Sequence, residues 1–113
     1  VVRPGEVNLM TAGRGISHSE VSTAGTSVLH GAQLWVVLPS GSAGIEPRFE
    51  HHVPPVVHPA DGVEARVFVG SLWGSVSPVS VETPLLGVEV VLAGGASSER
   101  STVSGMPALL PGV

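Results

Sequence analysis

The sequence predicts an all-β fold of short strands, and three observations support this prediction. Fifteen glycines and ten prolines separate short valine-rich runs along the 113 residues, a spacing that is typical of sandwiches and barrels. No run of useful length has a helical period. The chain is 42% hydrophobic and 12% charged, where globular chains average roughly a quarter charged residues. We therefore expect a partner chain or a further segment to cover apolar surface.

Short elements are expected at the start of the chain. Pro4 and Gly5 suit a turn, because proline fixes φ and glycine tolerates positive φ. A strand is expected at Val7–Thr11, and a second turn at residues 13–15. These two turns bound a short strand that can enter a sheet.

Two more strands are expected before residue 40. The first is Ile16–Glu20, followed by a polar loop over residues 21–25. The second, Ser27–Leu38, carries the strongest strand pattern in the sequence, because Leu34–Leu38 is apolar on both faces. Such a run predicts a central strand, and it predicts that Trp35 packs in the core.

The second half alternates between regular and irregular stretches. Residues 39–44 and 71–78 are expected to be loops, and residues 46–59 irregular, because four prolines interrupt the latter stretch. A turn is expected at Asp61-Gly62. The remaining strands are expected at Val63–Val69, Val79–Val81 and Val88–Leu92. Beyond Ala93 the pattern dissolves, so residues 94–113 are expected to form a poorly ordered tail.

Charge and composition exclude several classes of function. Five arginines, no lysine and nine acids give a net charge of −4, which argues against nucleic-acid binding and against docking on an anionic membrane. The absence of cysteine excludes disulfides and cysteine-rich zinc sites. No apolar run approaches the roughly 20 residues of a membrane-spanning helix, and no signal peptide is visible. We therefore expect a cytoplasmic protein.

His18 and Glu20 form the one pattern that suggests metal chemistry. On a strand, residues two apart project side by side from one face. An imidazole and a carboxylate together suit Fe, Mn, Ni or Zn, and two histidines with one carboxylate suit non-haem Fe(II). Two ligands hold a transition metal poorly, so further ligands must come from elsewhere. Alone, a pair of this spacing is more often an ordinary histidine and glutamate on a strand.

The residues around this pair are distinctive. Three stretches together resemble the pirin family: Thr11–Glu20, the preceding Arg3–Val7 and the later Leu29–Pro39. Three later stretches follow in the same order as in that family: Phe68–Gly70, Ser77–Val79 and Thr83–Leu86. The resemblance covers about residues 1–93, which it identifies as part of the N-terminal cupin domain of a pirin, with residues 94–113 as a tail unlike the family.

The resemblance implies a fold and a metal site. Pirins are two-domain cupins, and each domain is a jelly-roll β-barrel. Their N-terminal barrel holds one iron through three histidines and one glutamate, of which His18 and Glu20 correspond to two. The other two histidines come from an HxH motif on an earlier strand, which this chain lacks. We therefore expect an incomplete barrel, without its N-terminal strands and the second cupin domain, and a site with impaired affinity for Fe(II) or another divalent transition metal.

Three functions follow from the resemblance. Bacterial pirins include quercetin 2,3-dioxygenases, which implies a flavonol-like small molecule as substrate and a catalytic role for Glu20 in accepting its proton. Animal pirins look like non-enzymatic regulators that act through a protein surface. The third possibility is that the chain is an inactive product of a shortened pirin gene. The first residue, Val1, is not methionine, and this favours that possibility.

Exposed strand edges and other histidines leave further alternatives. An incomplete barrel presents open edges that favour homo-oligomers, and a dimer could join two copies of the His18–Glu20 pair. His30 is expected to be a hydrogen-bonded structural residue on its strand. The adjacent His51 and His52, and also His58, are expected to be solvated in the proline-rich stretch.

Overall fold

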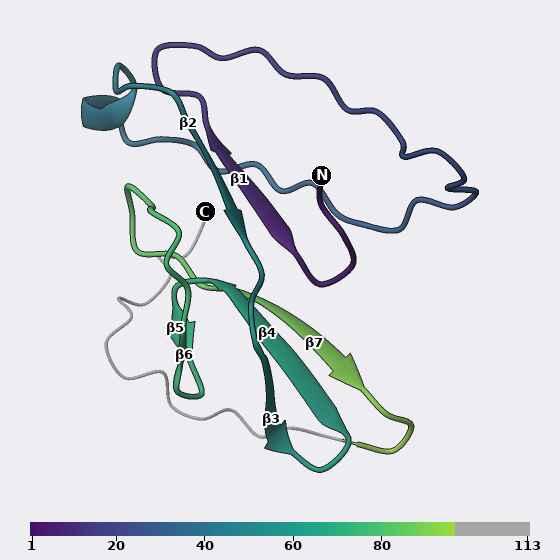
Figure 1. Cartoon of the computed structure of the whole chain (residues 1–113). Helices are drawn as coiled ribbons and strands as arrows, with labels where there is room; N and C mark the ends of the chain where they lie inside the picture. The colour runs from purple at the N-terminus through teal and green to yellow at the C-terminus, as the bar shows by residue number, and fades with distance from the viewer. Residues whose placement is uncertain (97–113) are drawn as a thin grey trace.

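The computed structural model describes residues 1–96 and is all-β apart from one 3-10 turn, η1, at Ser40–Ser42. Its seven strands in the described range form a two-stranded ribbon, a three-stranded sheet and a small hairpin (Figure 1). The all-β class predicted from the sequence is confirmed. The tail expected at 94–113 lies mostly outside the described residues.

The ribbon pairs β1 (Val7–Thr11) with β2 (Arg48–His52) in antiparallel register. Strand β1 has the predicted bounds, and the turn before it is closed by the Glu6 amide donating to the Arg3 carbonyl at 3.0 Å. Strand β2 lies in the stretch expected to be irregular, so that expectation is wrong. The prolines at 47, 54 and 55 all fall outside β2 and leave its ladder intact.

The main sheet has the order β3-β4-β7, and β4 (Val63–Val69) is its central strand. Alternate residues of β4 are buried and form most of the core: Val63, Ala65, Val67 and Val69. The edge strands are β3 (Val56–Ala60) and β7 (Gly87–Leu92). The predicted turn at Asp61-Gly62 joins β3 to β4. The strands predicted at 63–69 and 88–92 are thus confirmed, whereas β3 was not expected.

A tight hairpin replaces most of the loop expected at 71–78. It joins β5 (Ser71–Leu72) to β6 (Ser75–Val76) through Trp73 and Gly74. Both turn residues have positive φ, 49° and 75°, which matches the twist of a two-residue hairpin. The short strand expected at Val79–Val81 is not a strand, although Val79 is buried.

The segment between β1 and β2 corrects the two remaining strand predictions. Residues 12–39 contain no strand, and they run out from the ribbon and back in one long excursion (Figure 1). The strands expected at Ile16–Glu20 and Ser27–Leu38 are therefore absent. A strand needs a hydrogen-bonded neighbour, and none of the described residues pairs with this segment. Trp35, expected in the core, is 87% exposed.

Candidate functional site

His18 and Glu20 lie on the first half of this excursion. Their side chains are close even without a strand, since His18 Nε2 lies 3.7 Å from Glu20 Oε1. Both side chains are open to solvent, at 43% and 74% exposure. The pair therefore presents one nitrogen and one oxygen donor on the same side of an accessible segment.

This spacing suits two ligands of one metal ion. Metal–nitrogen and metal–oxygen bonds in such sites are about 2.0–2.2 Å long, so a single ion can contact two donors that lie 3.7 Å apart. Among residues 1–96, however, no group of three or more metal-ligating side chains comes together. The described residues thus fit half of a metal site and do not complete one.

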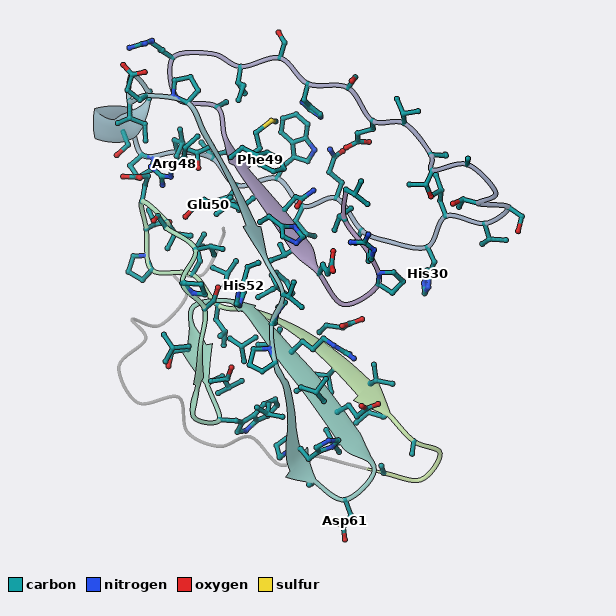
Figure 2. All side chains as sticks on the ribbon, in the orientation of Figure 1. His30, Arg48, Phe49, Glu50, His52 and Asp61 are labelled. Carbon is teal, nitrogen blue, oxygen red and sulfur yellow. The ribbon has the colours of Figure 1, made fainter. Side chains whose placement is uncertain are left out.

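Glu20 has one further partner across the excursion. Gln33 Nε2 donates a hydrogen bond of 3.2 Å to Glu20 Oε1, which ties the outgoing half of the segment to the returning half. His30 also lies on the returning half, but its side chain points outward, away from the β1–β2 ribbon (Figure 2). No hydrogen bond of His30 to a described residue is present, so the structural role expected for it is not supported by a contact.

The base of the excursion is held closed. The Arg14 amide donates to the Ile45 carbonyl at 3.0 Å, and the Arg14 guanidinium forms a two-pronged ion pair with Glu46. Gly13 has a φ of 53° and packs against the Ile45 backbone so closely that no side chain would fit. The predicted turn at 13–15 is therefore present, and it fixes where the segment with His18 and Glu20 leaves the ribbon.

A second polar cluster covers the part-buried face of β2, where Arg48, Glu50 and His52 lie in a row (Figure 2). Arg48 Nη2 donates to Glu82 at 2.7 Å and to the Ser80 carbonyl at 3.1 Å. The hydrogen bond to the Glu82 carboxylate raises the pKa of Arg48 above its usual value, and the charges of Glu82 and then Glu50 add to this effect. The cluster ties the ribbon to the 80–82 segment through charge-assisted hydrogen bonds.

Glu50 and His52 complete this cluster differently. Glu50 accepts from the Ser80 amide with both oxygens, at 3.0 and 3.2 Å. His52 Nε2 is buried and has no hydrogen-bond partner in the described part of the chain. The prediction that His52 is solvated in a loop is wrong, because His52 belongs to β2 and lies on its part-buried face. No sequence signal distinguished it from its neighbour His51.

The other histidines have local structural contacts. His51 Nδ1 lies 2.7 Å from Asn8 Oδ1 and its Nε2 lies 3.6 Å from Glu6, both across the ribbon. His58 Nδ1 lies 3.2 Å from the Val63 carbonyl. His51 and His58 lie in strands β2 and β3 and not in the expected loop, but both are exposed, as expected.

Known proteins similar to this chain include pirins and a quercetin 2,3-dioxygenase. The family described as Pirin matches residues 1–36, the stretch that includes His18 and Glu20. A crystal structure of quercetin 2,3-dioxygenase from Acinetobacter baumannii superposes with a TM-score of 0.74 at 48% identity, covering 80% of this chain. Human pirin is 35% identical over 106 residues, or 92% of this chain. The chain is thus similar to pirins and pirin-like proteins over most of its own length.

This chain matches only part of the length of each of these relatives. A Pseudomonas aeruginosa protein provisionally named a quercetin 2,3-dioxygenase is 42% identical over 90 residues, which are 80% of this chain and 29% of that protein. The chain spans 36% of human pirin and 30% of the Acinetobacter structure. It thus spans about a third of the length of the pirin relatives, and the predicted cupin-type fold is confirmed over that part.

Among residues 1–96 no helix is long and apolar enough to cross a membrane.

Proposed function

We propose that this chain is a pirin-type module that contributes His18 and Glu20 as two ligands of a mononuclear iron site. The observation that supports this proposal is the 3.7 Å separation of His18 Nε2 and Glu20 Oε1 inside the stretch that matches the pirin family. Fe(II) suits a mixed imidazole and carboxylate donor set. Another divalent transition metal of similar preference would occupy the same donors.

The proposed family activity is flavonol oxidation of the quercetin 2,3-dioxygenase type. The likeness to the Acinetobacter quercetin 2,3-dioxygenase supports it, at 48% identity. In this reaction we assign to Glu20 the acceptance of the proton from a flavonol hydroxyl. Its carboxylate is 74% exposed, so a planar phenol can reach it, and the Gln33 amide holds one of its oxygens in place.

Activity of this chain by itself is expected to be impaired. Structural metal sites contribute on the order of 10 kcal/mol only with a full ligand set, and residues 1–96 bring no third ligand to the pair. We therefore expect weak metal binding, and quercetin loss close to that of Fe(II) in buffer. The proposed cellular location is the cytoplasm.

The proposal is tested by an anaerobic Fe(II) titration of the full chain, followed by paramagnetic broadening of backbone amide signals. Broadening is expected around residues 16–22 and is expected to disappear in His18→Ala. The control is His30→Ala, which removes an exposed histidine outside the pair and should leave the broadening unchanged. Broadening that persists in His18→Ala would remove His18 from the proposed site.

A non-enzymatic pirin-type interaction protein is the second candidate function. The large exposed apolar side chains of the 12–39 excursion favour it, because contiguous exposed apolar surface marks interaction sites. Quercetin loss above the Fe(II) blank, abolished in Glu20→Gln, would select the enzyme. Loss close to the blank is the result already expected for an incomplete iron site, so it does not by itself select the interaction protein.

A further inference from the structure

Glu20 is held by a side chain from the returning half of the excursion. Gln33 Nε2 donates a hydrogen bond of 3.2 Å to Glu20 Oε1, and the same oxygen lies 3.7 Å from His18 Nε2. Across residues 1–96, this is the one hydrogen bond that joins residues 16–22 to residues 27–38. The place of the Glu20 carboxylate beside His18 therefore depends on a residue 13 positions later in the chain.

The contact between Gln33 and Glu20 gives the two carboxylate oxygens different surroundings. An ionised carboxylate only accepts hydrogen bonds, so the amide NH2 group, and not the amide oxygen, must face it. Oε1, the oxygen that lies near His18, accepts this bond, whereas Oε2 accepts none from the described residues. Since the Glu20 side chain is 74% exposed, little else restrains it, and without the bond the carboxylate is free to turn away from His18.

Gln33 holds the carboxylate without neutralising it. Residues 21–45 contain no Asp, Glu, Lys or Arg, and Arg14, at the base of the excursion, is paired with Glu46. The amide is a neutral donor, so its hydrogen bond fixes the direction of the carboxylate and leaves the negative charge in place. A metal cation benefits from both properties, because a fixed direction lowers the entropy cost of binding and the full charge supplies the attraction.

We propose that Gln33 is a positioning residue of the candidate metal site, whose amide fixes Glu20 beside His18 and thereby raises the affinity of the pair for a divalent metal ion. This inference rests on the proposed iron site. Carboxylate ligands of metals are themselves hydrogen-bonded by outer groups, and loss of such a group typically lowers metal affinity about 10–100-fold. Gln33 acts through Glu20 and is not counted as a ligand.

The hydrogen bond itself is tested without metal. The chain has one glutamine, Gln33, and one asparagine, Asn8, so the NMR signals of their side-chain NH2 groups are readily told apart. In Glu20→Ala the Gln33 signals are expected to move, because their acceptor is gone. The Asn8 signals are expected to stay in place, because Asn8 lies on β1 and contacts His51. Gln33 signals that stay in place would overturn the proposal, since Gln33 would then have no contact to act through.

The effect on metal binding is tested with the anaerobic Fe(II) titration of the 113-residue chain, read as broadening of the backbone amide signals of residues 16–22. Gln33→Met keeps the length of the side chain and removes the donor. Leu34→Met is the matched control, because it puts the same side chain at the next residue, which is 71% exposed. The Fe(II) concentration at half-maximal broadening is expected to rise about tenfold or more in Gln33→Met and to stay at the wild-type value in Leu34→Met.

The outcomes separate this inference from the iron site. Broadening in the wild type with an equal midpoint in Gln33→Met would overturn the role of Gln33 and leave the site. A midpoint that rises equally in Leu34→Met would also overturn it, because any change in this run would then suffice. An absence of broadening in the wild type would remove the iron site and the role of Gln33 with it. Both residues are exposed, so neither substitution threatens the fold, and circular dichroism checks this.

Discussion

Two stretches of this chain have nearly equal β-forming sequence and opposite structures. Val63–Val69 is the central strand of a sheet and lies between β3 and β7. Its residues Val63, Ala65 and Val67 are fully buried. Ser27–Leu38 is similarly apolar and has no charged residue, yet it forms no strand and is mostly exposed. The difference is the presence of hydrogen-bonded neighbours on both sides of one stretch only. Side-chain pattern specifies the capacity for a strand, and a paired neighbour makes it one.

The most severe test of this comparison places a charge in the buried strand. Val67→Asp puts an unpaired carboxylate in the core, which costs at least about 4 kcal/mol, and the sheet is expected to unfold. The matched control is Val76→Asp, because Val76 is 71% exposed in β6, and it should fold normally. Circular dichroism and urea unfolding measure both. Equal unfolding of the two variants would contradict the assignment of β4 to the core.

A medium effect is expected at the polar cluster between β2 and the 80–82 segment. Glu82→Gln removes the charge that holds Arg48 at 2.7 Å, and since both side chains are about a quarter to a third exposed, the urea midpoint is expected to fall clearly. The control is Glu46→Gln, which breaks the more exposed pair with Arg14 and should cost below about 0.5 kcal/mol. Urea midpoints compare the two. A larger loss in Glu46→Gln would reverse the order predicted here.

The smallest effect is expected in the excursion. Leu34→Ala removes a side chain that is 71% exposed, so in dilute, monomeric solution the free energy of unfolding should change by less than about 0.5 kcal/mol. Thermal unfolding at low concentration measures it. A loss of about 2 kcal/mol or more, as expected for a buried leucine, would show that the segment packs against the sheet in solution.

The sequence predicted the elements that have a strong local pattern. The strand at 7–11, the turn at Asp61-Gly62 and the strand at 63–69 agree with the structure because turn residues and period-two alternation determine them. Strands β2 and β3 were missed because prolines at 47, 54, 55 and 59 suggested irregularity. Three of these prolines lie outside strands, and Pro59 lies in an edge strand beside a register shift between Val57 and Ala60, where proline is tolerated.

The candidate site was predicted in part. The closeness of His18 and Glu20 was expected from a strand, and it is present at 3.7 Å without one. The inward position of His52 could not be predicted, because it depends on the register in which β2 pairs with β1. Sequence patterns carry the identity of ligand-type residues, whereas register decides which of them face inward.

The account rests most directly on the proposal that His18 and Glu20 are half of an iron site that residues 1–96 do not complete. The measurement is elemental analysis of iron in the folded 113-residue chain after anaerobic dialysis against Fe(II), with His18→Ala alongside. We predict iron far below one equivalent per chain, and lower still in His18→Ala. Stoichiometric iron in the wild type that withstands dialysis would contradict the account, because two ligands do not retain a metal so tightly.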